Sequence, residues 1–240
     1  LDTSIIDELP PGRTPIQTVT IPLDRREQVL QRIASNCREG KQAYWVCTLV
    51  EQSETLDAQA AEATYQEIKE RFPDINIGLV HGKMKADEKQ SVMQAFKDNQ
   101  LQLLIATTVI EVGVDVPNAS IMVIENAERL GLSQLHQLRG RVGRGATASF
   151  CALLYKTPLS QNGQERLSIL RESNDGFVIA EKDLEIRGPG ELLGTKQTGD
   201  MGFRVARLER DDHLLSQAHY VAAQILKDYP QHADGLLKRW

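Results

Sequence analysis

The feature of this 240-residue sequence that most constrains its fold is a regular alternation between short apolar runs and amphipathic segments. The apolar runs have the length and composition of buried strands, and the amphipathic segments repeat their apolar residues with the period of a helix. We therefore predict strands over 43–50, 75–81, 101–107, 121–125 and 148–155, and helices over 23–38, 56–71, 86–97 and 133–142. Such alternation is typical of an α/β fold in which helices sandwich a parallel sheet.

The points where this alternation starts and stops divide the chain into three segments. Residues 1–22 contain several prolines, which cannot sustain a helix, and we interpret them as an interdomain linker. Residues 23–157 form the α/β domain. After residue 157 the strands end, and residues 158–240 are expected to form a small, mostly helical extension, with helices over 162–173 and 211–229.

Composition excludes several classes of function. The formal net charge of -5 excludes a uniformly basic nucleic-acid binder, so any contact with nucleic acid must be local. The five histidines form no metal-ligand spacing, and no apolar run reaches the roughly 20 residues of a membrane helix. We therefore expect no metal site, no membrane partner and a cytoplasmic protein. Three widely spaced cysteines predict core thiols in a reducing compartment: Cys37, Cys47 and Cys151.

The segment from Gln137 to Arg144 concentrates positive charge around a glycine. On the expected helix, Arg141 and Arg144 would share one face while Arg139 points away. Guanidinium groups stay charged and present a planar fork of donors, which suits the charge on phosphoryl oxygens during transfer. The alternative is a solvated basic helix end. The pattern Gln-x-x-Gly-Arg-x-x-Arg resembles the last signature motif of superfamily-two helicases and translocases, which implies catalytic roles for Arg141 and Arg144 and nucleotide binding by Gln137.

The loop 107–117 follows an expected strand and combines hydroxyls, one glycine and one carboxylate. Hydroxyls and backbone amides donate to phosphate oxygens, and a carboxylate accepts from a ribose hydroxyl. The loop resembles helicase motif V. That resemblance implies that Thr107 and Thr108 contact the DNA backbone and that Gly113 and Asp115 approach the nucleotide. A tight turn capped by Asp115 is the alternative.

A shorter loop, residues 80–84, follows another expected strand. Gly82 would let a phosphate approach the main chain and Lys83 would supply charge, so both are DNA-binding candidates. The loop resembles helicase motif IVa, and a glycine that only forms a turn is the alternative. Because open parallel sheets bind ligands beyond the carboxyl ends of their strands, we expect the candidates of all these loops at that edge.

A phosphate cradle of the form Gly-x-x-x-x-Gly-Lys-Ser/Thr is absent from the sequence, and no acidic metal-binding box follows a strand. In the helicases that the motifs resemble, the cradle and the magnesium carboxylates lie on one RecA-like domain, and the arginine pair reaches in from a second. The resemblance therefore implies a second RecA-like domain. ATP and Mg²⁺ would be held mainly by a first motor domain that is not in this chain, and the chain alone would be inactive.

The stretch 175–199 is more specific than the helicase motifs. It resembles the translocation motif shared by the RecG helicases and the transcription-repair coupling factors, in which a helical hairpin and a loop couple cleft closure to movement on duplex DNA. The resemblance implies coupling roles for Arg166, Arg187 and Gln197. The linker at 7–15 and the residues 190–199 favour the RecG type.

Resemblance to RecG implies an ATP-dependent DNA helicase that remodels branched DNA by replication fork reversal and branch migration of Holliday junctions. It also implies partners: branched duplex DNA, the wedge domain and first motor domain of the same protein, and single-stranded DNA-binding protein. Two alternatives remain open at this point. One is the equivalent region of the transcription-repair coupling translocase. The other is a RecA-like module that only binds a partner, because a fold does not by itself determine function.

Overall fold

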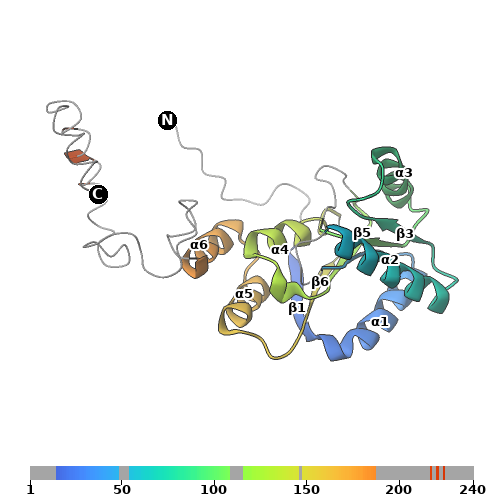
Figure 1. The fold of residues 1–240 in the computed structure, drawn as a ribbon, viewed down its shortest axis with the longest axis horizontal. Helices are drawn as coiled ribbons and strands as arrows, with labels where there is room; N and C mark the ends of the chain where they lie inside the picture. The colour runs from blue at the N-terminus through green and yellow to red at the C-terminus, as the bar shows by residue number, and fades with distance from the viewer. Residues whose placement is uncertain are drawn as a thin grey trace. The chain divides into compact units, whose positions relative to one another are not determined.

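The computed structural model describes residues 15–48, 54–108, 116–145 and 148–187, together with residues 217, 220, 221 and 224. Six parallel strands form one sheet in the order β1-β6-β5-β2-β4-β3 (Figure 1). The strands are β1 Ile16–Pro22, β2 Gln42–Val46, β3 Ile77–Val80, β4 Leu103–Ala106, β5 Ala119–Ile124 and β6 Ser149–Tyr155. The helices are α1 Arg26–Arg38, α2 Glu54–Arg71, α3 Ala86–Lys97, α4 Leu132–Arg139, α5 Gln161–Glu172 and α6 Gly176–Arg187, with the 3-10 turns η1 Leu23–Arg25 and η2 Ala127–Arg129.

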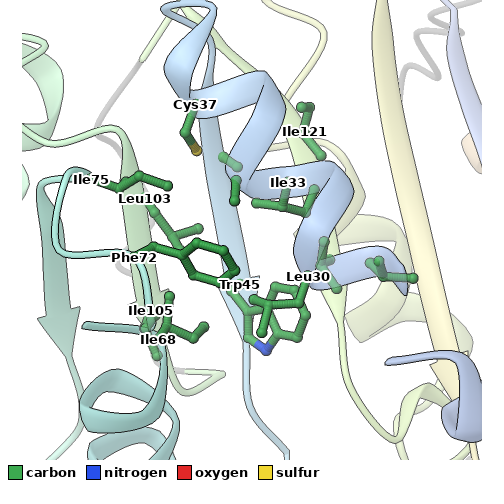
Figure 2. Packing of buried hydrophobic residues seen from close by; sticks show 14 of the residues in the cluster. Leu30, Ile33, Cys37, Trp45, Ile68, Phe72, Ile75, Leu103, Ile105 and Ile121 are labelled. Carbon is green, nitrogen blue, oxygen red and sulfur yellow. The ribbon is translucent and has the colours of Figure 1, made fainter. Parts of the chain in front are cut away.

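One face of the sheet is covered by α1 and α2. The apolar stripe of α1, which includes Leu30, Ile33 and Cys37, packs onto β2 around the buried indole of Trp45. Figure 2 shows this indole beneath Leu30, with Phe72, the residue that follows α2, beside it. The stripe arises because residues three and four apart share one side of a helix, so the apolar spacing of 29–37 makes α1 amphipathic.

The opposite face is covered by α3, α4 and α5. Phe96 of α3 meets the ring of Tyr44 on β2 edge to face, with the ring centroids 5.0 Å apart. Neighbouring strand residues point to opposite sides of a sheet, so Tyr44 faces away from Trp45 and its α1 contacts. The expected α/β sandwich with a parallel sheet is confirmed, and each face has its own set of covering helices.

Edge strand β1 differs from the sequence interpretation, which assigns residues 16–22 to the linker. These residues pair in parallel with β6 along their whole length, from Ile16 opposite Ser149 to Pro22 opposite Tyr155. Nothing local reveals this pairing, because the partner strand lies far away in the sequence. Residues 1–14 of the expected linker lie outside the described residues.

Two helices also differ from the expected boundaries. The helix predicted over 133–142 is α4, and it ends at Arg139. Residues 176–187, which lie between the helices expected over 162–173 and 211–229, form helix α6, in line with the helical hairpin that the resemblance implies; α5 and α6 are thus two successive helices. The chain divides into two compact units, Leu1–Asp183 and Leu184–Trp240. In the second unit, residues 217, 220, 221 and 224 of the helix expected over 211–229 are helical.

Candidate nucleotide and nucleic-acid site

The four DNA-binding candidates meet at the carboxyl ends of β3 and β4. These strands are neighbours, and the backbone amide of Thr107 donates to the carbonyl of Val80 at 3.1 Å. This bond brings Thr107 and Thr108 beside Gly82 and Lys83, which follow β3 directly. Lys83 is exposed and Gly82 and Thr108 are half-buried, whereas Thr107 is only 3% exposed. In this conformation Gly82, Lys83 and Thr108 present the accessible atoms of the group.

The turn that carries Lys83 is held by its neighbours. The amide of Met84 donates to the carbonyl of His81 at 3.2 Å, which closes the turn. The buried ring of His81 lies with Nε2 3.3 Å from a carboxylate oxygen of Glu62 on α2. The carboxyl edge of the sheet therefore carries an exposed lysine on a closed turn.

The arginine segment has a different geometry from the one expected. Helix α4 ends at Arg139, Gly140 is its C-cap, and Gly143 takes a positive φ of 79°. Arg141 and Arg144 therefore lie on a turn after the helix, and the expectation that they share a helix face is wrong. The physical reason is that two glycines within four residues favour leaving the helix over continuing it.

Both arginines nevertheless lie on the same short turn. Arg141 is buried, and its pKa is lowered by that burial and, second, by the positive charge of Arg144. The Nε of Arg144 donates to the carbonyl of Gly140 at 3.3 Å. Gln137, the third candidate of this segment, is exposed on α4. Two guanidinium groups in one short segment have the charge and donor geometry that suit a multiply charged anion.

Not all candidates lie at one edge of the sheet, which corrects the expectation for this fold. Helix α4 follows the carboxyl end of β5 and runs back along the strands, so the segment after it lies near their amino ends. A Cβ at Gly145 would stand 2.5 Å from the carbonyl oxygen of Pro117, which precedes β5. Gly113 and Asp115 lie outside the described residues. Of the residues that flank this gap, Thr108 follows the carboxyl end of β4 and Val116 precedes the amino end of β5.

Arg139 is the residue that sequence reasoning missed. Its side chain is 2% exposed, and Nη1 donates to the carbonyls of Leu170 at 2.7 Å and Ser173 at 2.8 Å. Nη1 also contacts the hydroxyl of Thr18 at 3.3 Å, and Nη2 lies 3.0 Å from Nδ1 of His136. Burial lowers the pKa of its guanidinium.

A signal for the burial of Arg139 exists in the sequence. The buried residues Leu132 and Leu135 of α4 place position 139 on the same stripe, at the spacing i, i+3, i+7. An arginine within an apolar stripe is an exception that needs internal acceptors, because a buried charge without partners is strongly disfavoured. The acceptors come from β1 and α5, which are distant in sequence.

The coupling candidates are described in part. Arg166 of α5 donates from Nη2 to the carbonyl of Glu128 at 2.8 Å and from Nη1 to that of Leu130 at 3.1 Å, so it binds the segment that leads into α4. Arg187 is the last residue of α6, and its side chain lies outside what the structure describes. Gln197 also lies outside the described residues.

Within the described part of the chain, no group of three or more His, Cys, Asp or Glu side chains could hold a metal ion, and no helix is long and apolar enough to cross a membrane. The three cysteines are buried and unpaired, as expected of core thiols, and burial raises the pKa of each to about 12: Cys37, Cys47 and Cys151.

Comparison with known proteins supports the resemblance read from the motifs. Residues 24–146 match the model of the helicase conserved C-terminal domain, and residues 173–235 match that of ATP-dependent DNA helicase RecG, domain 3, C-terminal. The whole chain is 65% identical to the ATP-dependent DNA helicase RecG of Escherichia coli (strain K12) and 62% identical to that of Haemophilus influenzae. It spans about a third, 35%, of the length of each of these relatives.

Solved structures agree with this result. A structure of RecG bound to a three-way DNA junction is 44% identical and superposes with a TM-score of 0.67, covering 87% of this chain and 27% of that one. The yeast DEAD-box splicing factor Prp28, 16% identical with a TM-score of 0.55 over 80% of this chain and 40% of its own, shares the fold alone. The chain therefore belongs to the family of helicase conserved C-terminal domains, and within that family it is similar to RecG.

Proposed function

We propose that this chain is the second motor domain and translocation hairpin of an ATP-dependent DNA helicase that remodels branched DNA. The observation that carries the proposal is the turn after α4, which holds Arg141 and Arg144 close enough for their charges to interact. Paired guanidinium groups stabilise charge that develops on phosphoryl oxygens. The chain has this half of a nucleotide site and no phosphate cradle in its sequence, so ATP and Mg²⁺ would be held mainly by a first motor domain.

Each group of candidates has a role in this proposal. Arg141 and Arg144 are the catalytic arginines, and Gln137, Gly113 and Asp115 are nucleotide contacts. The DNA backbone is bound at the carboxyl edge of β3 and β4, where Lys83 supplies charge and amides and hydroxyls donate to phosphates. The remaining DNA candidates are the neighbours of Lys83 at that edge: Gly82, Thr107 and Thr108.

The proposed substrate is branched duplex DNA, on which the enzyme reverses stalled forks and migrates Holliday junctions. A RecG structure was solved on a three-way DNA junction, and this chain is 44% identical to that protein. The proposed partners are the wedge and first motor domains of the same protein and single-stranded DNA-binding protein, and the proposed location is the cytoplasm. Arg166, Arg187 and Gln197 would couple cleft closure to movement on DNA.

Two other functions are less well supported. The transcription-repair coupling translocase shares the hairpin motif, but the full-length similarity of this chain is to RecG. A binding module without catalysis would not need two arginines at the spacing of the helicase motif, a residue type and spacing that suit phosphoryl charge.

The experiment is a chimera in which this chain replaces the matching 35% of Escherichia coli RecG. We expect the isolated chain to hydrolyse no ATP and the chimera to show ATP turnover stimulated by three-way junction DNA. Arg144→Ala in the chimera should lower turnover by about a thousandfold or more. Arg171→Ala, at an exposed arginine of α5, is the matched control and should leave turnover unchanged.

Three results would contradict the proposal. ATP turnover by the isolated chain would show a complete nucleotide site. A folded chimera without junction-stimulated turnover would exclude the helicase function for this chain. Turnover that survives Arg144→Ala would remove the catalytic role of the arginine pair.

A further inference from the structure

Arg139 joins the end of α4 to the end of α5. Its two short hydrogen bonds go to the carbonyls of Leu170 and Ser173, in the last turn and at the C-cap of α5. Carbonyls at a helix C-terminus have no partner within the helix and carry the negative end of its dipole, so a buried guanidinium is well matched to them. The side chain is 2% exposed, which protects these bonds from competing water.

The same arginine is tied to the proposed catalytic turn through the backbone. The amide of Val142 donates to the carbonyl of Arg139 at 3.2 Å, and the amide of Arg141 donates to the carbonyl of Leu138 at 3.0 Å. The turn that carries Arg141 is therefore hydrogen-bonded to the backbone of Arg139, whose side chain donates to the carbonyls at the end of α5. A displacement of this turn acts directly on the α5 carbonyls.

The start of α6 lies against the same cluster. A Cβ at Gly176, the first residue of α6, would stand 3.2 Å from Nε2 of His136. The Nδ1 of that ring lies 3.0 Å from Nη2 of Arg139. Arg139 thus contacts α5 directly and the first residue of α6 through one imidazole, at the point where the chain passes from one helix to the next.

The amino-terminal end of α4 is held by two hydrogen bonds in which α5 supplies the donor. Arg166 reaches from α5 to the carbonyls of Glu128 and Leu130, just before α4 begins. Helix α4 is therefore held to α5 near both of its ends by arginine-to-carbonyl bonds. Charge-assisted bonds at two separated points prevent the helices from sliding or pivoting against each other.

We propose that Arg139 is a positioning residue that makes the Arg141–Arg144 segment and the α5–α6 pair move as one body. Movement of the catalytic arginines during ATP turnover is then transmitted to the hairpin that moves DNA. This inference rests on the proposed helicase function. It adds a residue that has no part in binding nucleotide or DNA, because Arg139 is buried among carbonyls of its own chain.

The test uses the chimera with Arg139→Met, which keeps an unbranched apolar stem and removes the guanidinium. The quantity measured is the amount of junction DNA unwound per ATP hydrolysed. We expect this ratio to fall by roughly three- to thirtyfold, the range that residues on a coupling path cover. Arg171→Met on the exposed side of α5 is the control and should leave the ratio unchanged.

Arg139→Lys is the second variant and carries the same test if Arg139→Met does not fold. An ammonium keeps the charge but cannot fork between carbonyls and an imidazole, so the ratio should fall less than in Arg139→Met. A residue with only a structural role would lower ATP turnover and unwinding by the same factor, and an unchanged ratio would overturn the inference. If the parent chimera lacks junction-stimulated turnover, the proposed function fails; a working parent with an unchanged ratio in both variants refutes only the coupling role.

Discussion

Replacing Gly145 by alanine should disturb the proposed catalytic turn while the chain still folds. The added Cβ would stand 2.5 Å from the carbonyl oxygen of Pro117, and ordinary contact begins at 3.4 Å, so the two backbones must separate by about 0.9 Å. Neither atom belongs to a flexible side chain, so the backbone has to move. Overpacking of this kind costs roughly 1–3 kcal/mol. With a urea slope of about 2 kcal/mol per molar, the unfolding midpoint should fall by about 1 M.

The functional effect should be larger, because Arg144 is the adjacent residue. A misplacement of about 1 Å in a catalytic group lowers the rate by about a hundredfold, and we expect that loss in junction-stimulated ATP turnover by the chimera. Gly163→Ala on α5 is the matched control. Its Cβ would stand 3.2 Å from the hydroxyl of Ser160, which accepts a hydrogen bond from the amide of Gly163 as the N-cap of α5, so this change strains the start of α5 and leaves the turn of Arg144 in place; turnover should stay at the parental level. Parental turnover in Gly145→Ala would refute the idea that contact with Pro117 positions Arg144.

The remaining predictions concern stability and titration. Phe96→Ala should cost about 3–5 kcal/mol in urea denaturation because the ring is 0% exposed, whereas Phe177→Ala, at 62% exposure, should cost under about 0.5 kcal/mol; equal losses would contradict the described packing. Hydrogen bonds from Arg71 lower the pKa of Glu27 from 4.5 to about 2, so the stability it adds is complete above pH 4.5 and lost as pH falls towards 2. Glu27→Gln should flatten that part of the acid unfolding curve. An unchanged curve would show that the ion pair between Arg71 and Glu27 adds no stability. Burial raises the pKa of all three thiols to about 12: Cys37, Cys47 and Cys151. Iodoacetamide at pH 8 should therefore label these cysteines only after unfolding. Labelling of the native protein would contradict their positions in the core.

Local pattern in the sequence was enough to predict most of the sheet. Strands β2 to β6 and helices α1 to α4 lie where apolar runs and helical periodicity place them, because a strand buried on both faces must be apolar along its length. The positions of the DNA-binding candidates could also be predicted from the sequence. They lie in the loops that follow β3 and β4, and because these strands are parallel neighbours, Gly82 and Thr107 lie at the same carboxyl end of the sheet.

Motifs in the sequence also indicated the family. The arginine pattern and the stretch 175–199 consist of residues whose type and spacing serve chemistry, so they can be read without coordinates. The match of 24–146 to the helicase conserved C-terminal domain and the 65% identity to RecG agree with that reading.

Contacts between distant segments decided what the sequence could not. Strand β1 exists because residues 16–22 pair with β6, and helix α4 ends at Arg139 because Gly140 and Gly143 favour a turn. Arg139 could be expected to point away from Arg141 and Arg144, but its burial depends on the carbonyls of Leu170 and Ser173, which lie 31 and 34 residues further along the chain. Sequence thus determined which groups this protein has and on which kind of element each lies. Tertiary structure decided which of them touch, because hydrogen bonds and packing between segments far apart in the chain depend on their final positions and leave no local pattern.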